Sequence, residues 1–134
     1  MKINNAKYYL PALAWALAIT IVSAIPHLSA PPVGLTFSDK LAHFTEYFVL
    51  GALVTFGSWR SGSRLLNLPV AILLCAAFGA IDELHQSFVP GRSMDIYDVI
   101  ADTIGASSGT SAMSIYYRKM QKRSLRQSLP RSVK

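Results

Sequence analysis

Residues 81–102 read IDELHQSFVPGRSMDIYDVIAD, and this stretch decides how the rest of the chain can fold. It holds five of the seven acidic residues in a chain that is 51% hydrophobic and only 15% charged. Apolar segments flank it on both sides. Ionisable groups next to apolar segments turn towards partners, because an unpaired charge in an apolar environment is costly. The stretch therefore predicts a place where several helices bring their polar side chains together.

The composition indicates a membrane protein. The 134 residues suit one domain, and their formal net charge of +6 could suit nucleic-acid binding. However, residues 8–38 contain no Asp, Glu, Lys or Arg, and the mean hydropathy of +0.34 is high for a soluble domain. We therefore predict an integral membrane protein that does not bind nucleic acid. Its one cysteine, Cys75, lies in an apolar run and is expected to be a small buried hydrophobic residue.

Four stretches are long enough to cross a bilayer as helices: residues 8–25, 41–59, 65–81 and 96–117. The fourth contains Asp98 and Asp102, but the tyrosines at its end are typical of an interfacial anchor. The predicted fold class is an all-α membrane protein, a bundle of four transmembrane helices. Residues 1–117 would form this domain and residues 118–134 a basic cytoplasmic tail. The first stretch could instead be a signal peptide, but its length and Pro31 after Ala30 argue against cleavage.

The basic residues predict the orientation of these helices, because cytoplasmic loops are enriched in Lys and Arg. One side of a four-span topology would carry only Lys40 and Arg92. The other side would carry Lys2, Lys7, Arg60, Arg64, Arg118, Lys119, Lys122, Arg123, Arg126, Arg131 and Lys134. Both termini are therefore predicted to be cytoplasmic, and the loops at residues 26–40 and 82–95 to face outward.

The polar residues repeat at helical spacing on the outward side. Asp39, His43 and Glu46 share one helical face, and the acids at 95, 98 and 102 share another. Ionisable groups in spans normally face the interior of the bundle, so these faces should converge. The predicted outward-facing pocket is lined by Asp39, His43, Glu46, Asp82, Glu83, Gln86, Asp98 and Asp102. Lys40, Tyr47 and Arg92 complete the expected ligand-binding set, and the candidate catalytic residues are His43, Glu46, Asp82, Glu83 and Asp98.

Several of these residues have a structural as well as a functional interpretation. Asp39 and Asp95 sit at expected helix starts, where a carboxylate can serve as a cap. Arg92, in the turn signal VPGR, could pin its loop through a salt bridge to Asp82 or Glu83. Alternatively, its guanidinium could meet an anion such as a phosphate, which is the interpretation we favour.

Other patterns suggest packing or ordinary surface positions. No spacing matches a known metal template, so we predict neither a metal nor another cofactor. His27 is expected to be an ordinary loop residue, and His85 could point towards the cluster or away from it. The GASSG segment from Gly105 to Gly109 allows close helix approach, within the bundle or between copies in a homo-oligomer.

Two blocks of sequence resemble the VanZ-like family of small membrane proteins. They are DKLAHFTEYFVLG at Asp39–Gly51 and DELHQSFVPGRSMDIYDVIADTIGASSG at Asp82–Gly109. The resemblance covers most of residues 38–110, with one departure, because Asp102 stands where the family typically has Asn. It implies a multi-pass protein of the bacterial cytoplasmic membrane. The family's namesake is associated with low-level resistance to the glycopeptide antibiotic teicoplanin.

Three classes of function fit these features. The favoured class is a non-catalytic envelope protein that binds a polar lipid or glycopeptide headgroup, such as a lipid-linked cell-wall precursor, and affects teicoplanin sensitivity. The alternative is a membrane enzyme acting on a lipid-linked phosphate, with His43 or a carboxylate as general base and Arg92 holding the phosphate. The third is a small proton-coupled transporter with Glu46 or Asp102 as the proton site. Membrane lipids would be partners in all three.

Overall fold

The computed structural model describes residues 3–27, 36–62 and 67–128. The main chain forms a short 3-10 helix, η1 (Ile3–Tyr9), followed by α1 (Leu10–Ser23), α2 (Thr36–Ser61), α3 (Leu68–Gln86) and α4 (Ile96–Ser128). The described residues include no strand, so the prediction of an all-helical fold is confirmed. Predictions concerning Lys2, Ala30, Pro31, Arg64, Arg131 and Lys134 fall outside the described residues.

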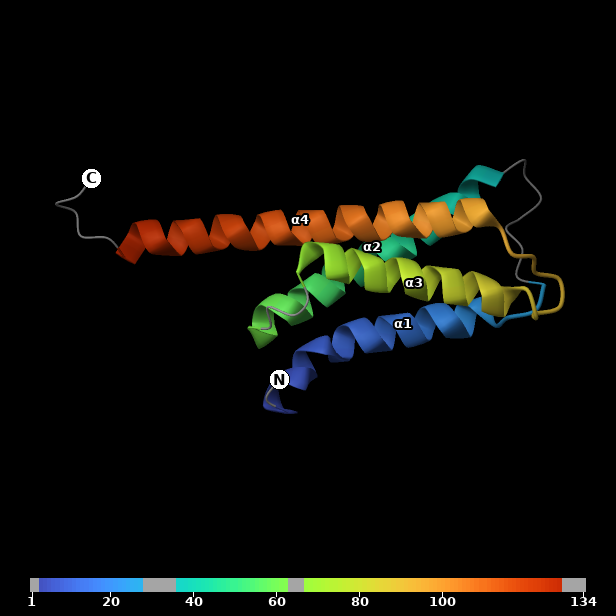
Figure 1. The fold of residues 1–134 in the computed structure, drawn as a ribbon, viewed down its shortest axis with the longest axis horizontal. Helices are drawn as coiled ribbons and strands as arrows, with labels where there is room; N and C mark the ends of the chain where they lie inside the picture. The colour runs from blue at the N-terminus through green and yellow to red at the C-terminus, as the bar shows by residue number, and fades with distance from the viewer. Residues whose placement is uncertain (1–2, 28–35, 63–66, 129–134) are drawn as a thin grey trace.

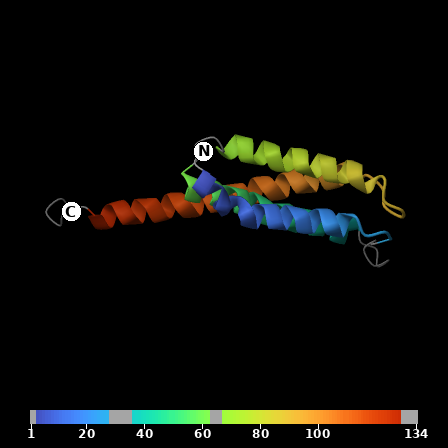
Figure 2. The ribbon, with the colours of Figure 1, turned by 90° about the horizontal axis from the view of Figure 1, so that it is seen from below.

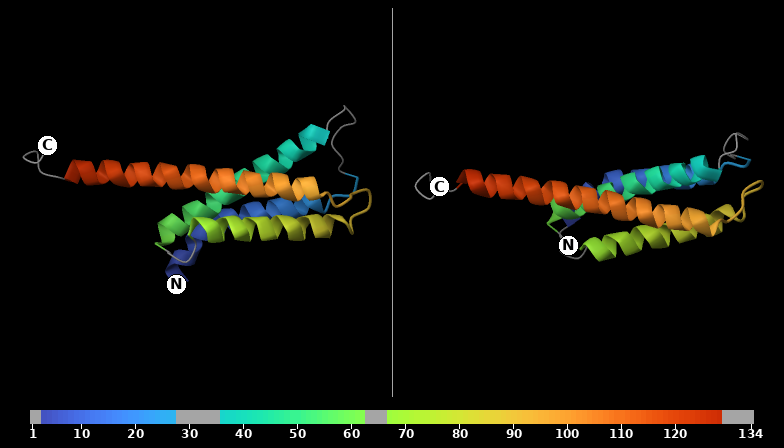
Figure 3. Two further views of the ribbon diagram at one scale, coloured as in Figure 1. Left: turned by 45° about the horizontal axis from the view of Figure 1, so that its top comes forward. Right: turned by 90° about the horizontal axis from the view of Figure 1, so that it is seen from above.

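The α-helices run alternately up and down, so both chain ends lie towards one end of the bundle (Figure 1). We call this the terminal end, and we call the end where α3 connects to α4 the loop end. The closest pair is α2 with α4, and these helices cross obliquely (Figure 3). Within the described residues α1 packs on α2 and α3 but not on α4. Helix α4 reaches far past the others at its C-terminal end (Figure 2).

Glycines bring α2 and α4 together. A Cβ atom at Gly105 or Gly109 would clash with the backbone carbonyl of Phe44 or Phe48, and one at Gly51 would clash with that of Ala106. The backbones therefore approach each other closely along this seam, as small residues permit. The glycines of the GASSG segment thus serve packing inside one chain, and association between copies stays a prediction that would need another surface.

Local signals explain where the helices begin. Asn67 caps α3 by accepting a hydrogen bond from the Val70 N–H at 3.2 Å, and Pro69 occupies the first turn. Asp95 caps α4, since its Oδ1 accepts from the Tyr97 N–H at 2.8 Å. The predicted cap role of Asp95 is therefore confirmed.

Three helices extend beyond the spans predicted for them. Helix α2 begins at Thr36 rather than at 41, so Asp39 lies inside its first turn instead of capping it. Helix α3 continues to Gln86 rather than ending at 81, and α4 continues to Ser128 rather than 117. Hydropathy falls at the first charged residue, whereas backbone hydrogen bonding continues past it. The polar residues expected in loops thus lie on the last or first turns of helices.

Two stretches of the described chain are long and apolar enough to cross a membrane, judged by length and composition. They are Asn5–Ser23, with a mean hydropathy of 1.3, and Leu68–Gln86, with 1.6. Helices α2 and α4 fall short of this measure, because both carry more polar residues along their length. Cys75 is buried, as predicted from its apolar neighbours.

Candidate functional site at the loop end

The acidic and histidine side chains meet at the loop end of the bundle, on α2, α3 and α4. His43 lies at the centre, with its Nδ1 3.0 Å from Asp102 Oδ1 on α4. Its Nε2 lies 3.8 Å from Glu83 Oε1 on α3, which is an ion-pair distance but too long for a hydrogen bond. All three side chains are buried. The spacing of acids along each helix therefore predicted a convergence that the structure contains.

Lys40 joins the beginning of α2 to the beginning of α4. Its Nζ donates to Asp95 Oδ2 at 2.7 Å and to Asp98 Oδ1 at 2.8 Å. The hydrogen bond from Lys40 lowers the pKa of the Asp95 carboxyl below its ordinary value. Burial disfavours the charged form of Lys40, but these two hydrogen bonds outweigh it and raise the pKa of the ammonium. Lys40, expected to contact ligand, thus has two carboxylate partners within the chain.

Asp82 is held by neutral donors rather than by a cation. Ser23 Oγ on α1 donates to Asp82 Oδ2 at 2.6 Å, and Gln86 Nε2 donates to the same oxygen at 3.1 Å. Ser23 was not among the residues predicted for the cluster. The sequence carries only a weak indication of this role, since a hydroxyl in an apolar helix usually donates to the backbone of its own helix, as Thr20 does here.

Two carboxylate oxygens in the centre of the cluster lack a hydrogen-bond donor. Glu83 accepts from the Asp95 N–H at 2.9 Å through Oε2, while its Oε1 has no hydrogen bond. Asp102 Oδ2 is also without one, and it packs against Gly79, where a Cβ would lie 2.8 Å from this oxygen. Buried acceptors are normally satisfied, so these oxygens mark where a proton, a water or a ligand would act.

Arg92 makes no ion pair within 4.0 Å in the described part of the chain, and its Nε is buried without a hydrogen-bond partner. The alternative in which Arg92 pins its loop through Asp82 or Glu83 is therefore absent from this structure. The loop is held differently, because the His27 N–H donates to the Pro90 carbonyl at 3.1 Å. Gly91 allows this contact with its φ of 77° and with no Cβ to strike the His27 ring.

The remaining predicted residues surround this network. Glu46 is half-buried, and the charge of Arg92 lies close enough to act on it. Tyr47 is fully buried against Phe78, with ring centroids 6.0 Å apart, and its hydroxyl has no hydrogen bond. The sequence left two orientations possible for His85. Its side chain is exposed and therefore points away from the cluster.

One set of donor atoms has the composition of a cation site. Asp39, His43 and Asp98 each place one such atom within 4.8 Å of the other two. Carboxylate and imidazole ligands together suit several divalent metals. However, Lys40 already brings a positive charge to Asp98, and Asp102 already engages His43. The expectation that the protein uses no metal stays a prediction.

Most of the central side chains of the cluster are buried. One hollow of the described structure, of about 430 Å³, lies apart from the cluster, at the terminal end. The outward-facing pocket at the cluster stays a prediction.

Comparison with known proteins finds a relative in Schizosaccharomyces pombe, whose name is "Uncharacterized protein C11E3.10". It is 31% identical over 108 residues, which are 80% of this chain and 65% of the relative, so the chain spans less than two thirds of that protein. No solved structure matches the chain. The family described as VanZ/LLP1 matches residues 5–117, which include all the residues of the polar network, and the chain belongs to this family.

Proposed function

We propose that the protein is a multi-pass membrane protein that binds a polar lipid or glycopeptide headgroup at the loop end. The four α-helices would cross the bilayer, with both termini cytoplasmic. The distribution of side chains supports this, because large apolar residues face outward while charged residues face inward. On α4, Ile96, Ile100 and Ile104 are exposed on one face while Asp98 and Asp102 are buried on another. This arrangement suits an apolar solvent.

The same contrast supports α1 and α3 as spans. Leu13, Leu17 and Leu73 are each more than 60% exposed, at 63%, 61% and 68%. In water such surfaces would mark an interface, whereas in a bilayer they would contact lipid. Helix α4, at about 1.5 Å per residue over 33 residues, is about 50 Å long and exceeds the roughly 30 Å hydrocarbon core. Its basic C-terminal turns would therefore lie beyond the core.

Fusion reporters test this topology. Reporters placed after Trp59 and after Tyr117 are expected to give a cytoplasmic signal, and one at Val89 an exterior signal, because Lys and Arg favour the cytoplasmic side. A cytoplasmic signal at Val89 would reverse the assignment and place the polar network on the inner face.

The observation that carries the binding proposal is that Arg92 has no ion pair among the described residues, while the other basic side chains of the network have carboxylate partners. Lys40 is held by Asp95 and Asp98, and His43 by Asp102. Arg92 can therefore bind an anion, and its planar guanidinium suits hydrogen bonds to a phosphate. A phosphorylated polyprenyl lipid or a lipid-linked cell-wall precursor carries such a group. In a bacterial membrane, this binding would alter sensitivity to teicoplanin.

The test is to purify the protein gently and identify co-purifying lipids by mass spectrometry. Phosphorylated lipids are expected with the wild type and to be lost from Arg92→Gln. Arg126→Gln is the matched control, because it removes the same charge from an exposed position on α4. Equal retention of phosphorylated lipid by Arg92→Gln and the control would refute the proposed role of Arg92.

A membrane enzyme is the second candidate, and the His43–Asp102 pair favours it. Asp102 engages Nδ1 at 3.0 Å, which leaves Nε2 without a hydrogen bond, the arrangement of an oriented general base. Conversion of the bound lipid to a new product by the wild type, with its loss in His43→Gln, would decide for catalysis. Binding without any conversion would leave the headgroup-binding role.

A further inference from the structure

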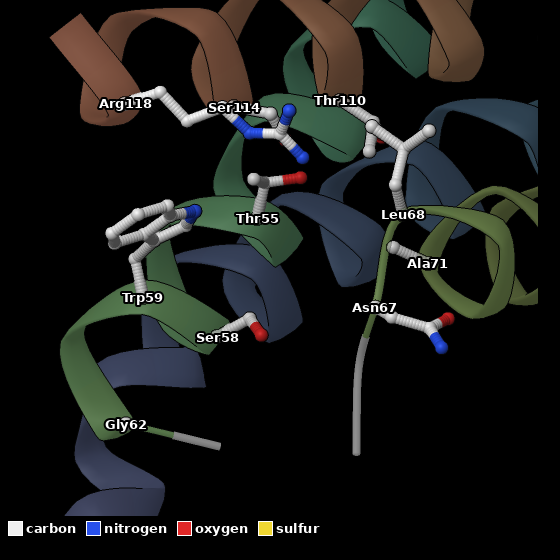
Figure 4. Close-up of a pocket in the computed structure, with 10 residues that line it drawn as sticks. All are labelled: Thr55, Ser58, Trp59, Gly62, Asn67, Leu68, Ala71, Thr110, Ser114 and Arg118. Carbon is white, nitrogen blue, oxygen red and sulfur yellow. The ribbon is translucent and has the colours of Figure 1, made fainter. Parts of the chain in front are cut away.

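A hollow of about 430 Å³ lies at the terminal end, between the last turns of α2, the first turns of α3 and the middle of α4 (Figure 4). Its volume is within the range of small-molecule sites. The polar network is elsewhere: Glu46 precedes Thr55 by nine residues on α2, or about 14 Å. Asp102 precedes Thr110 by eight residues on α4, or about 12 Å. This hollow is therefore separate from the site described above.

The groups that line the hollow are rich in donors and include no carboxylate. Arg118 reaches from α4 across the hollow towards Thr55 (Figure 4). Asn67 uses its oxygen to cap α3, so its amide N–H groups stay available. Trp59 adds an indole N–H and Ser114 a hydroxyl. A lining of donors with one cation suits an anion.

The hydroxyl of Thr110 gives an independent sign that this hollow is a binding site. Its side chain lines the hollow and is fully buried, yet its Oγ1 has no hydrogen-bond partner. The other threonine hydroxyls described in the structure each donate to the carbonyl four residues earlier: Thr20, Thr45, Thr55 and Thr103. A buried hydroxyl that forgoes this local bond needs another partner.

No acidic side chain is available to Arg118. All seven acids of the chain fall between residues 39 and 102, and the described helices place them at the loop end. Aromatic rings gather beside Arg118, since Trp59 stacks on Tyr117 with centroids 5.1 Å apart. Tyr8 lies under the guanidinium of Arg60 at 5.3 Å. Such aromatic and basic groups are typical of the membrane–water boundary.

We infer that the hollow at the terminal end binds a phosphate group, with Arg118 supplying the charge and Thr110, Asn67 and Ser114 supplying donors. The phosphate can come from an anionic lipid headgroup or from free phosphate in the cytoplasm. This goes beyond the proposed function, because it uses neither Arg92 nor any residue of the polar network. The lipid source requires the proposed membrane location, whereas the free anion does not.

The test uses the full chain purified in a non-ionic detergent and titrated with three probes. They are short-chain phosphatidic acid, short-chain diacylglycerol without a phosphate, and inorganic phosphate. Phosphatidic acid is expected to bind saturably and diacylglycerol is not. Arg118→Gln should weaken binding about tenfold or more, since it removes a charge-assisted hydrogen bond. Thr110→Val, which keeps the shape and removes the hydroxyl, should weaken it several-fold.

Arg123→Gln is the matched control, because it removes the same charge from an exposed position on α4 outside the hollow. It should bind as the wild type does. The loss caused by Arg118→Gln should be the same in the Arg92→Gln background, which separates this inference from the proposed function. Binding of inorganic phosphate with the same dependence on Arg118 would identify the free anion as the source. Equal losses in Arg118→Gln and Arg123→Gln, equal binding of diacylglycerol, or no saturable binding of either phosphate probe would overturn the inference. If Arg118→Gln does not fold, as judged by size exclusion, Thr110→Val carries the test.

Discussion

The two ends of the bundle handle charge in opposite ways. At the loop end, carboxylates of α3 and α4 and Asp95 have partners within the chain, namely Lys40, His43 or uncharged donors. At the terminal end, the described basic residues have no carboxylate nearby, and two of them lie on aromatic rings instead. The loop end is thus a network whose members depend on one another, while the terminal end presents positive charge to its surroundings.

This difference separates residues that hold the fold from residues that await a ligand. A charge with partners inside the chain stabilises the packing, so its removal should lower stability. Arg92 and Arg118, which have no ion pair with any described residue, should matter for binding and hardly at all for stability. Substitutions of the same kind at the two ends therefore test the comparison directly.

The largest loss of folding stability is expected from His43→Leu. The change leaves the carboxylates of Asp102 and Glu83 buried without the imidazole between them, and breaking a buried pair typically costs about 3–5 kcal/mol. Thermal unfolding of the purified protein in detergent measures it. Arg123→Leu at the terminal end should change the free energy of unfolding by no more than about 0.5 kcal/mol. Equal melting temperatures for the two variants would contradict the claim that only the loop-end charges stabilise the fold.

A smaller loss is expected from Lys40→Met, which keeps much of the side-chain length and removes the charge. It breaks both hydrogen bonds that tie α2 to the start of α4, and the pair is partly exposed, so we expect about 1–2 kcal/mol. Lys122→Met on the exposed end of α4 is the matched control. In the double variant Lys40→Met/Asp98→Asn, the second change should recover part of the loss, as coupled pairs do. Strict additivity would show that the two side chains do not interact in solution.

The ion pair also predicts a dependence on pH. The pKa of Asp95 is lowered in the folded protein, so its contribution to stability is complete above the ordinary aspartate value of about 4 and is lost as the pH falls through the folded value. The melting temperature should therefore fall between pH 5 and pH 3, and less steeply in Lys40→Met, where the pKa of Asp95 returns towards normal. An unchanged slope in that variant would assign the acid sensitivity to other carboxylates.

The sequence predicted the helices and the meeting of their polar faces, because apolar length and helical spacing are both local properties. It did not predict where α2 begins or where α3 and α4 end, since helical hydrogen bonds continue past the first charge. It also assigned Lys40 to the ligand-binding set and named no partner for it within the chain. Only the packing of α2 on α4 places its ammonium between Asp95 and Asp98.

The hollow at the terminal end was not predicted from the sequence. Its basic residues were interpreted as a topological signal, and the hollow beside Arg118 is formed by residues far apart in the sequence. Thr110 carried no sequence signal at all, because a threonine in a helix normally bonds to its own backbone. Sites built from single residues of several helices need the tertiary structure to become visible.

The smallest effect is expected from Asp102→Asn, which places at this position the residue typical of VanZ-like proteins. An asparagine oxygen can still accept a hydrogen bond from His43 Nδ1, which Asp102 Oδ1 meets at 3.0 Å. Its amide nitrogen would take the place of Oδ2, the atom beside Gly79 that has no donor in the structure. Removing a buried carboxylate offsets the weaker bond to His43, so stability should change by less than about 1 kcal/mol.

Thermal unfolding of Asp102→Asn beside Asp102→Leu checks this prediction. The leucine variant deprives His43 of its acceptor and should lose markedly more stability, because it leaves a buried imidazole N–H without a partner. If instead the asparagine variant loses as much as the leucine variant, the negative charge of Asp102, rather than its hydrogen bond, holds His43. The stability of the loop end would then depend on an ionised pair in its interior. It would differ from the terminal end only in that its charges are neutralised within the chain.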